Sequence, residues 1–231
     1  MQYRNLGRTG LKVSEMCLGS DNFGNSFGAS PETSFRILDR ALDFGVNFID
    51  TADQYAKGNS ETVIGEYLSS RKKRDDVVLA SKFWTPTGPG PNDYGNSRYH
   101  LMNAVEASLK RLQTDHIDLY IIHAPDPTTP LDETLEALTD LRRAGKVRYI
   151  GVSNFPAWLL MEGLWISDVK NLARFDCIQS GYNLLRPGMA CDVLELCVDQ
   201  GIGATAYSPM ASGMLTGKHD RRAEVPESDT K

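Results

Sequence analysis

The sequence contains few cysteines and no long apolar run. Its four cysteines, Cys17, Cys177, Cys191 and Cys197, show no CxxC spacing, which is typical of reduced thiols rather than of a disulfide framework. No apolar stretch approaches the roughly 20 residues that a membrane-spanning helix requires, and the first ten residues contain no apolar segment of a secretory signal. We therefore expect a cytoplasmic protein without a membrane partner.

Excess positive charge and metal-ligand spacing are also lacking. The 25 lysines and arginines are outnumbered by 30 aspartates and glutamates, and no basic stripe is present, so a nucleic-acid partner is not expected. The longest basic run, residues 71–74, is followed at once by two aspartates and is interpreted as a solvated helix end. The four histidines are scattered without ligand spacing, so no metal site is predicted.

Apolar runs alternate with helical patterns along almost the whole chain. After a short hairpin at residues 3–14, strands are predicted at 15–19, 46–50, 77–82, 117–123, 147–151, 175–179 and 202–207, and helices at 31–44, 60–70, 98–112, 131–144, 156–169 and 188–200. No GxGxxG follows the first strand, which weighs against a Rossmann domain. We predict a single α/β domain over residues 1–231, a TIM-type (β/α)8 barrel that lacks the eighth strand and the C-terminal helices.

Four polar residues stand at or just beyond predicted strand ends: Asp50, Tyr55, Lys82 and His123. Each has an ordinary explanation when taken alone: Asp50 caps a turn, Lys82 is solvated at the rim, Tyr55 packs in a loop, and His123 is structural. Taken together they favour chemistry, because the C-terminal ends of the strands form the active-site face of a βα-barrel.

The four residue types suit protonation of an oxygen atom. A free tyrosine has a pKa of about 10, and a nearby ammonium lowers it, so Lys82 is expected to acidify Tyr55. A buried ammonium needs a carboxylate, and Asp50 follows the neighbouring strand. His123 is expected to donate a hydrogen bond to a carbonyl oxygen.

Several separated strings, DFGVNFIDTADQY, ASKFW, DLYIIH, GKVRYIGVSN and AYSPMASGMLTGK, resemble the aldo-keto reductases in order and spacing. The resemblance extends from the N-terminal hairpin to about Lys218. It implies a barrel that binds NADP(H) and reduces a small aldehyde or ketone to an alcohol by hydride transfer. It also implies that Tyr55 is the proton donor, that Lys82 and Asp50 tune its pKa, and that His123 orients the carbonyl group.

The resemblance also implies cofactor and substrate positions. The cofactor-binding residues that it implies are Gly19, Ser20, Asp50, Ser153, Asn154, Gln179, Tyr207, Ser208, Pro209, Met210, Ala211, Ser212, Gly213 and Lys218. Phe23, Trp84 and the long loop at residues 85–97 are expected to line the substrate pocket. Gly181 departs from the pattern, because many members of the family carry a glutamate there.

The family pattern continues beyond the last residue of this sequence. A seven-stranded sheet leaves two unpaired edges, so we expect weakened dinucleotide affinity and a homo-oligomer that forms through the open seam. A non-catalytic nicotinamide-binding subunit or an inactive fragment is the alternative to a reductase. A third reading makes Lys82 the Schiff-base nucleophile of an aldolase-like barrel.

Overall fold

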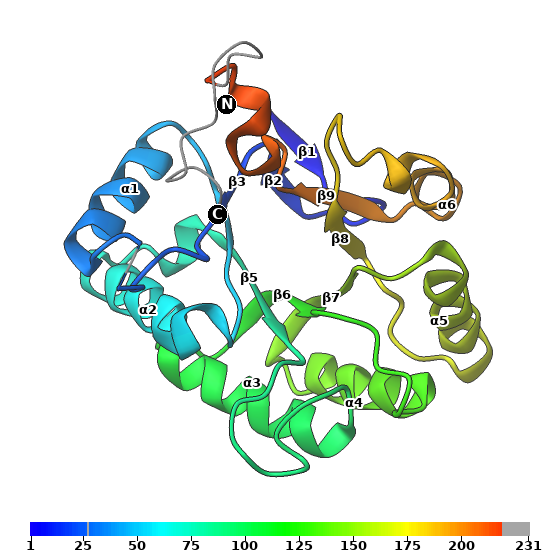
Figure 1. Ribbon diagram of the computed structural model, residues 1–231. Coiled ribbons are helices and arrows are strands. Elements are labelled where there is room, and N and C mark those ends of the chain that lie inside the picture. Colours follow the sequence, from blue (N-terminus) through cyan, green and yellow to red (C-terminus); the bar gives the residue numbers. More distant parts are fainter. Residues whose placement is uncertain (27, 219–231) are drawn as a thin grey trace.

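A curled sheet of seven parallel strands forms the centre of the computed structural model, which describes residues 1–26 and 28–218. Helices surround its outer face, and the sheet stays open between its two end strands (Figure 1). The strands, in spatial order, are β3 (Cys17–Gly19), β4 (Phe48–Asp50), β5 (Val78–Phe83), β6 (Ile117–Ile122), β7 (Val147–Ser153), β8 (Cys177–Gly181) and β9 (Gly203–Tyr207). The predicted α/β barrel-type fold is therefore confirmed, as a half-barrel with the expected seven strands.

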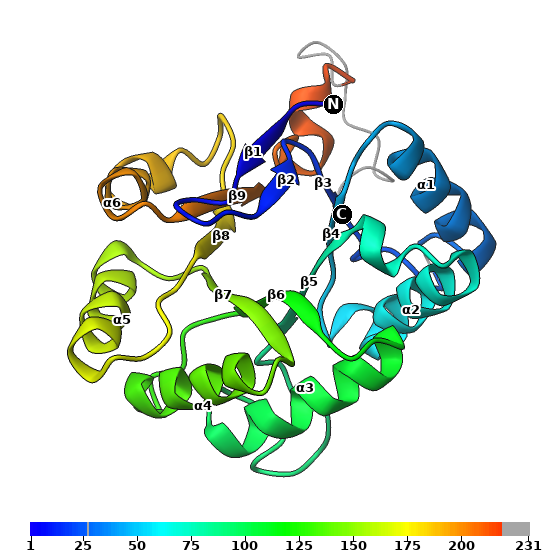
Figure 2. The same ribbon diagram turned by 180° about the vertical axis from the view of Figure 1, so that it is seen from behind.

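The predicted N-terminal hairpin is also confirmed. Strands β1 (Tyr3–Asn5) and β2 (Lys12–Ser14) pair antiparallel, beside β3 and β9 (Figure 2). Two apolar side chains from this segment, Leu6 and Val13, pack with Phe48 from β4 and Leu119 from β6. The hairpin thus fills the interior with apolar side chains at the N-terminal ends of the strands. The C-terminal ends of the strands remain for polar groups.

The helices lie close to the positions predicted from the sequence. They are α1 (Pro31–Asp43), α2 (Asn59–Arg71), α3 (Arg98–Leu112), α4 (Leu131–Arg143), α5 (Ala157–Lys170) and α6 (Val193–Gln200), with short 3-10 turns η1 (Tyr55–Gly58), η2 (Arg74–Asp76), η3 (Gly188–Ala190) and η4 (Ala211–Thr216). The Ser30 side chain accepts a hydrogen bond from the Thr33 backbone N–H, and Ser97 accepts one from that of His100. Within the described ranges, no helix has the length and apolar character needed to cross a bilayer.

Several segments differ from the expectation. The strand predicted at 15–19 begins at Cys17, that at 147–151 extends to Ser153, and that at 175–179 lies at Cys177–Gly181. The predicted helix at 188–200 is divided into η3 and α6, because Asp192 leaves the helical region with a φ of −145°. The predicted strand at 46–50 begins only at Phe48. The Asn47 backbone N–H donates to Ser14 Oγ of the hairpin, while its carbonyl oxygen still accepts from the Val78 N–H of β5. The basic run is not wholly solvated: Arg74 pairs with the buried Asp118 at 2.8 Å.

The two-residue period of the strands sorts side chains between the faces of the sheet. Ile49 and Leu79 pack outward with the helices, whereas Phe48 and Ala80 belong to the interior cluster. Asp50 and Lys82 lie two residues beyond Phe48 and Ala80, so they project into the same interior, at the C-terminal ends of the strands.

Candidate active site

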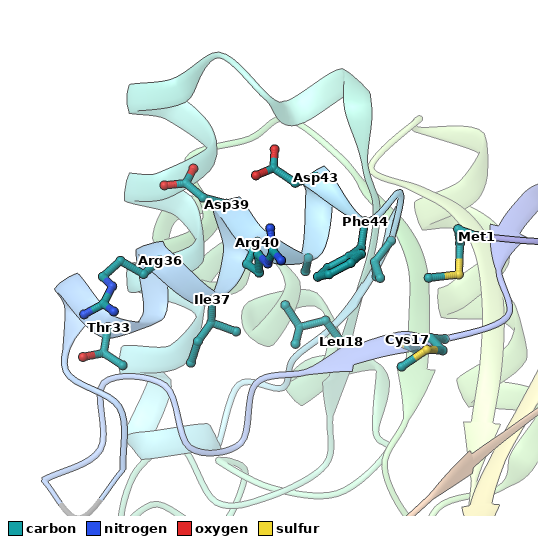
Figure 3. A pocket seen from close by; sticks show the side chains of 13 residues that line it. Met1, Cys17, Leu18, Thr33, Arg36, Ile37, Asp39, Arg40, Asp43 and Phe44 are labelled. Atoms are coloured by element: carbon teal, nitrogen blue, oxygen red, sulfur yellow. The ribbon is translucent and has the colours of Figure 1, made fainter.

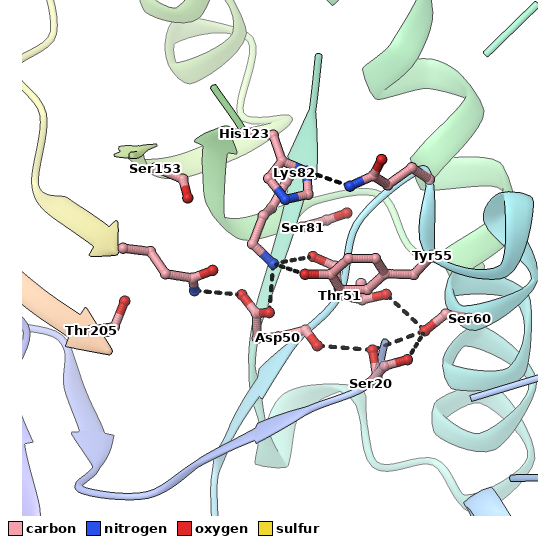
Figure 4. A network of polar contacts seen from close by, with 12 residues as sticks. Ser20, Asp50, Thr51, Tyr55, Ser60, Ser81, Lys82, His123, Ser153 and Thr205 are labelled. Carbon is pink, nitrogen blue, oxygen red and sulfur yellow. Dashed lines mark hydrogen bonds and ion pairs between the residues drawn. The ribbon is translucent and has the colours of Figure 1, made fainter. Parts of the chain in front are cut away.

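Lys82 is the centre of a buried polar network at the C-terminal ends of the strands (Figure 4). Its side chain is fully buried, and Nζ donates to Asp50 Oδ2 at 2.5 Å, to the Thr51 carbonyl oxygen at 3.0 Å and to Tyr55 Oη at 3.1 Å. Burial opposes the charged amine, but Asp50 and Tyr55 outweigh it and raise the pKa of Lys82. Lys82 is therefore a permanent ammonium whose three N–H groups are all engaged.

Tyr55 begins η1, directly after the loop that leaves β4. Burial raises the pKa of its phenol above the ordinary value, and Lys82 offsets only part of that effect. This net direction is opposite to the one expected from the sequence, because burial outweighs the ammonium. The phenol therefore carries its proton throughout the physiological pH range.

Asp50 connects Lys82 of β5 with Gln179 of β8. Its Oδ2 accepts from Lys82, and its Oδ1 accepts from the amide of Gln179 in β8 at 2.9 Å. Both residues are 7% exposed. The carboxylate thus holds the ammonium on one side and orients an amide from the far side of the sheet on the other.

His123 directly follows β6 and faces Tyr55. The two rings meet edge to face, with centroids 5.9 Å apart, and His123 Nδ1 lies 3.3 Å from Gln54 Nε2. Burial, followed by the positive charge of Lys82, lowers the pKa of His123 to about 4. The imidazole is therefore neutral at pH 7.

A second group of polar side chains comes from β7, β9 and the loop after β7. Asn154 has a φ of +61°, a left-handed conformation that asparagine tolerates better than most residues. Its Nδ2 donates to Ser153 Oγ at 3.0 Å and to the His123 carbonyl oxygen at 3.3 Å, while its Oδ1 accepts from Tyr207 Oη at 2.9 Å. Asn154 therefore ties three predicted site residues together.

Most of these groups border one cavity of about 480 Å³, whereas Lys82 reaches it only through its contacts with Asp50 and Tyr55. The lining residues are Cys17, Gly19, Ser20, Asp21, Asp50, Tyr55, His123, Ser153, Asn154, Gln179, Thr205, Ala206, Tyr207, Ser208 and Pro209. Ser20 is fully buried, and its hydroxyl donates to the Asp50 carbonyl oxygen at 2.8 Å while Ser60 of α2 donates to it (Figure 4). Ser20 thus also fixes the end of β4 against α2.

Other predicted residues lie apart from this cavity. The cofactor residues outside its lining are Met210, Ala211, Ser212, Gly213 and Lys218, in and around η4. Lys218 lies beside this turn, since a Cβ on Gly213 would come within 3.1 Å of its Cε. Of the two predicted substrate residues, Phe23 is buried in the core at 4% exposure, and Trp84 borders the loop at 85–97 with a φ of +147°. The structure does not bring either one to the cavity wall.

The model of the Aldo/keto reductase family matches residues 15–231. The chain belongs to the aldo/keto reductase family. It is 43% identical over 227 residues to an uncharacterized oxidoreductase, YrpG, of Bacillus subtilis (strain 168), covering 94% of this chain and 69% of the relative. It is 40% identical to a probable voltage-gated potassium channel subunit beta of Arabidopsis thaliana, covering 99% of this chain and 70% of the relative. It is 36% identical to norsolorinic acid reductase B of Dothistroma septosporum, covering 96% of this chain and 60% of the relative.

Several residues of this site were not predicted from the sequence, among them Cys17, Asp21 and Ala206, which line the cavity. Gln54 contacts His123, the Thr51 carbonyl oxygen accepts from Lys82, and Thr205 lines the cavity. Gln54 stands next to Tyr55 in the sequence, so its position was a usable signal. Thr205 gave no signal, because only the pairing of β8 with β9 brings it near Gln179.

A larger hollow of about 990 Å³ lies outside the sheet, between β3 and α1 (Figure 3). Its wall is mainly apolar, with Met1, Leu18, Ile37 and Phe44 among the lining residues. The charged side chains that line it, such as Arg40 and Asp43, all belong to α1. None of the four predicted catalytic residues lines it. The smaller cavity is therefore the candidate active site of this aldo/keto reductase.

Proposed function

We propose that this chain is an NADP(H)-dependent oxidoreductase that reduces small aldehydes or ketones to alcohols. One observation carries the proposal: a fully buried lysine binds both a carboxylate and a tyrosine hydroxyl at a cavity that also exposes a neutral imidazole. Membership of the aldo/keto reductase family supports an oxidoreductase acting on small carbonyl compounds.

The side chains divide the work of protonating a carbonyl oxygen. The neutral imidazole of His123 donates a hydrogen bond that aims the carbonyl group. As negative charge develops on the oxygen, Tyr55 transfers its phenolic proton to it. The tyrosinate left behind is stabilised by the Lys82 ammonium 3.1 Å away. Asp50 keeps that ammonium charged and in place.

The residues around the cavity fit a nicotinamide cofactor. The hydroxyl of Ser153 and the amides of Asn154 and Gln179 match a carboxamide in donors and acceptors, and Tyr207 presents a ring that is 40% exposed. A Cβ on Gly181 would lie 3.2 Å from two ring carbons and the hydroxyl oxygen of Tyr207, so glycine there makes room for that side chain. When bound, the cofactor supplies the hydride. Ser208, Pro209 and the residues around η4 are proposed to hold its more distant part.

A non-catalytic cofactor-binding subunit is the second candidate. Two relatives, from Arabidopsis thaliana and Oryza sativa, are named probable voltage-gated potassium channel subunit beta. Retention of all four predicted catalytic residues favours the reductase. The aldolase-like alternative is disfavoured, because the Lys82 amine is engaged by three acceptors and its pKa is raised.

Substitution of Tyr55 tests the proposal. Tyr55→Phe removes the donated proton and is expected to reduce kcat for a reactive aldehyde by about 10²- to 10⁴-fold, because general acids contribute that much to rates. The measurement is NADPH oxidation at steady state, with binding followed by the fluorescence of the three tryptophans.

Tyr99→Phe, at a 64% exposed position on α3, is the matched control and should leave kcat unchanged. Cofactor binding without aldehyde reduction by the wild-type chain would favour the non-catalytic subunit. Absence of both would indicate an inactive fragment.

Two further predictions extend this proposal. We propose that the chain is a single domain over residues 1–231 located in the cytoplasm. We also propose that it forms a homo-oligomer through the side of the sheet between β3 and β9, where no strand of the described ranges pairs with either outer edge.

A further inference from the structure

Gln54 places an amide against the catalytic imidazole. Its Nε2 lies 3.3 Å from His123 Nδ1, and the residue directly precedes Tyr55 on the loop after β4. An amide nitrogen has hydrogens and no available lone pair, so it only donates. His123 Nδ1 must then accept, which leaves the ring proton on Nε2.

The other contacts of His123 fix the ring in place. Its backbone N–H donates to the Phe83 carbonyl oxygen at 2.9 Å, and its own carbonyl oxygen accepts from Asn154. The edge of the ring meets Tyr55. With Nδ1 occupied by Gln54, Nε2 is the ring nitrogen that remains for a molecule in the cavity.

We propose that Gln54 is a positioning residue: it holds His123 in the tautomer that carries the proton on Nε2, so that the imidazole offers a donor to the cavity. A carbonyl oxygen has only lone pairs, so the opposite tautomer would present a second acceptor to it. The inference deepens the proposed reduction and rests on it for the use of that donor. The tautomer itself is measurable without any turnover.

Gln54→Glu is the decisive variant. It preserves the shape of the side chain but replaces the hydrogen-bond donor that faces His123 Nδ1 with an acceptor. A carboxylate accepts, so it draws the proton to Nδ1 and deprives Nε2 of its hydrogen. The charged groups that already face the ring are Lys82 and Asp50, with the Tyr55 phenol beside them. The added carboxylate favours the imidazolium, which carries a proton on both nitrogens, so lower pH should restore the donor.

The experiment combines 15N NMR of histidine-labelled protein with kinetics between pH 5 and pH 8. Wild-type His123, identified by the loss of its signals in His123→Gln, should show a pyridine-like Nδ1 and a pyrrole-like Nε2 at pH 7. Gln54→Glu should reverse the two at pH 8 and lower kcat/KM by about tenfold, comparable to one lost hydrogen bond. Its kcat/KM should recover as the pH falls.

Gln54→Met removes the donor and offers only a weak acceptor, so it should give mixed tautomers with a smaller loss of kcat/KM. Gln2→Glu, an exposed glutamine before the hairpin, is the charge-matched control and should change neither measurement. A pyrrole-like Nδ1 in the wild type, or unchanged tautomers in Gln54→Glu, overturns the assignment. Reversed tautomers with undiminished kcat/KM overturn the positioning role. Expected tautomers in a wild-type chain that reduces no carbonyl compound overturn the proposed function and leave the assignment supported.

Discussion

Lys82 and Asp53 are both buried ionisable residues near the loop that carries Tyr55, but their surroundings differ. Lys82 has an acceptor for each of its three N–H groups. Asp53, 4% exposed, accepts from Thr85 at Oδ1, while its Oδ2 has no hydrogen-bond partner among residues 1–26 and 28–218. Burial, and then the nearby Glu61 carboxylate, raise the pKa of Asp53 to about 7.

This raised pKa predicts a stability that depends on pH. The unfolded carboxyl loses its proton near pH 4, whereas the folded one keeps its proton up to about pH 7. The contribution of the protonated Asp53 carboxyl to the free energy of unfolding is therefore complete below about pH 4. It is lost as the pH rises through 7. Asp53→Asn removes the charge and should increase the free energy of unfolding at pH 8 by on the order of 2–4 kcal/mol relative to wild type.

Urea unfolding at pH 4.5 and pH 8 checks this prediction. The gain from Asp53→Asn should shrink at the lower pH, and Asp75→Asn at an exposed position should show no such difference. Equal effects of Asp53→Asn at both pH values would show that Asp53 ionises normally in the folded chain.

The sequence was informative about single residues wherever strand periodicity decides their direction. Asp50 and Lys82 follow apolar residues at a spacing of two, so their convergence could be predicted from strand ends alone. The direction of the pKa shift of Tyr55 could not be predicted. It depends on whether the effect of burial, which raises the pKa, exceeds that of the Lys82 ammonium 3.1 Å away, which lowers it. The position of Gln54 beside Tyr55 could have marked it as a site residue, but its contact with His123 could not be predicted, because the two residues are 69 positions apart.

At the scale of elements, the helices pack by close approach of their backbones. Gly65 in α2 faces the end of α3: an added Cβ would lie 2.3 Å from the Arg111 carbonyl oxygen and 2.8 Å from the Leu112 Cα. Glu61, one turn earlier in α2, pairs with Arg111 at 2.7 Å and accepts from Ser81 of β5. Glycine therefore allows α2 and α3 to meet one turn from an ion pair whose carboxylate is fully buried.

Gly65→Ala tests this packing against helix propensity. Propensity alone predicts a gain of about 1 kcal/mol for alanine. Overpacking costs about 1–3 kcal/mol, and backbone atoms of α3 cannot move aside as a flexible side chain can. We expect a net loss of up to about 2 kcal/mol in the free energy of unfolding. Ser69→Ala, exposed in the same helix, is the matched control and should be neutral or slightly stabilising.

Element identity was easier to predict than element ends. The seven sheet strands overlap the apolar runs of the sequence. The match is clearest for β5 and β6, whose residues are all buried, since burial on both faces leaves continuous apolar sequence. The start of β4 differs from the predicted one where the Asn47 N–H donates to Ser14 of the hairpin, a contact between residues 33 positions apart. The division between η3 and α6 follows from backbone angles near Asp192 that no apolar pattern records.

At the scale of the whole molecule, two apolar surfaces compete as sites of association. One is the hollow beside β3, where Met16 and Phe44 are 65% and 58% exposed. The other is a stripe on α5, where Trp158 and Trp165 are 67% and 61% exposed, two turns apart on one side of the helix. The two surfaces lie on opposite sides of the molecule (Figures 1 and 2).

We expect self-association to use the surface beside β3, because unpaired strand edges add backbone donors and acceptors to its apolar contacts. Met16→Glu and Phe44→Glu place a charge at positions that tolerate solvent, so they should shift a concentration-dependent dimer towards monomer without unfolding the chain. Trp158→Glu and Trp165→Glu, equally exposed on α5, are the matched controls and should leave the equilibrium unchanged. Sedimentation velocity over a hundredfold range of protein concentration measures the effect. A wild-type chain that stays monomeric throughout, or dimers dissociated only by the α5 variants, would contradict association through β3.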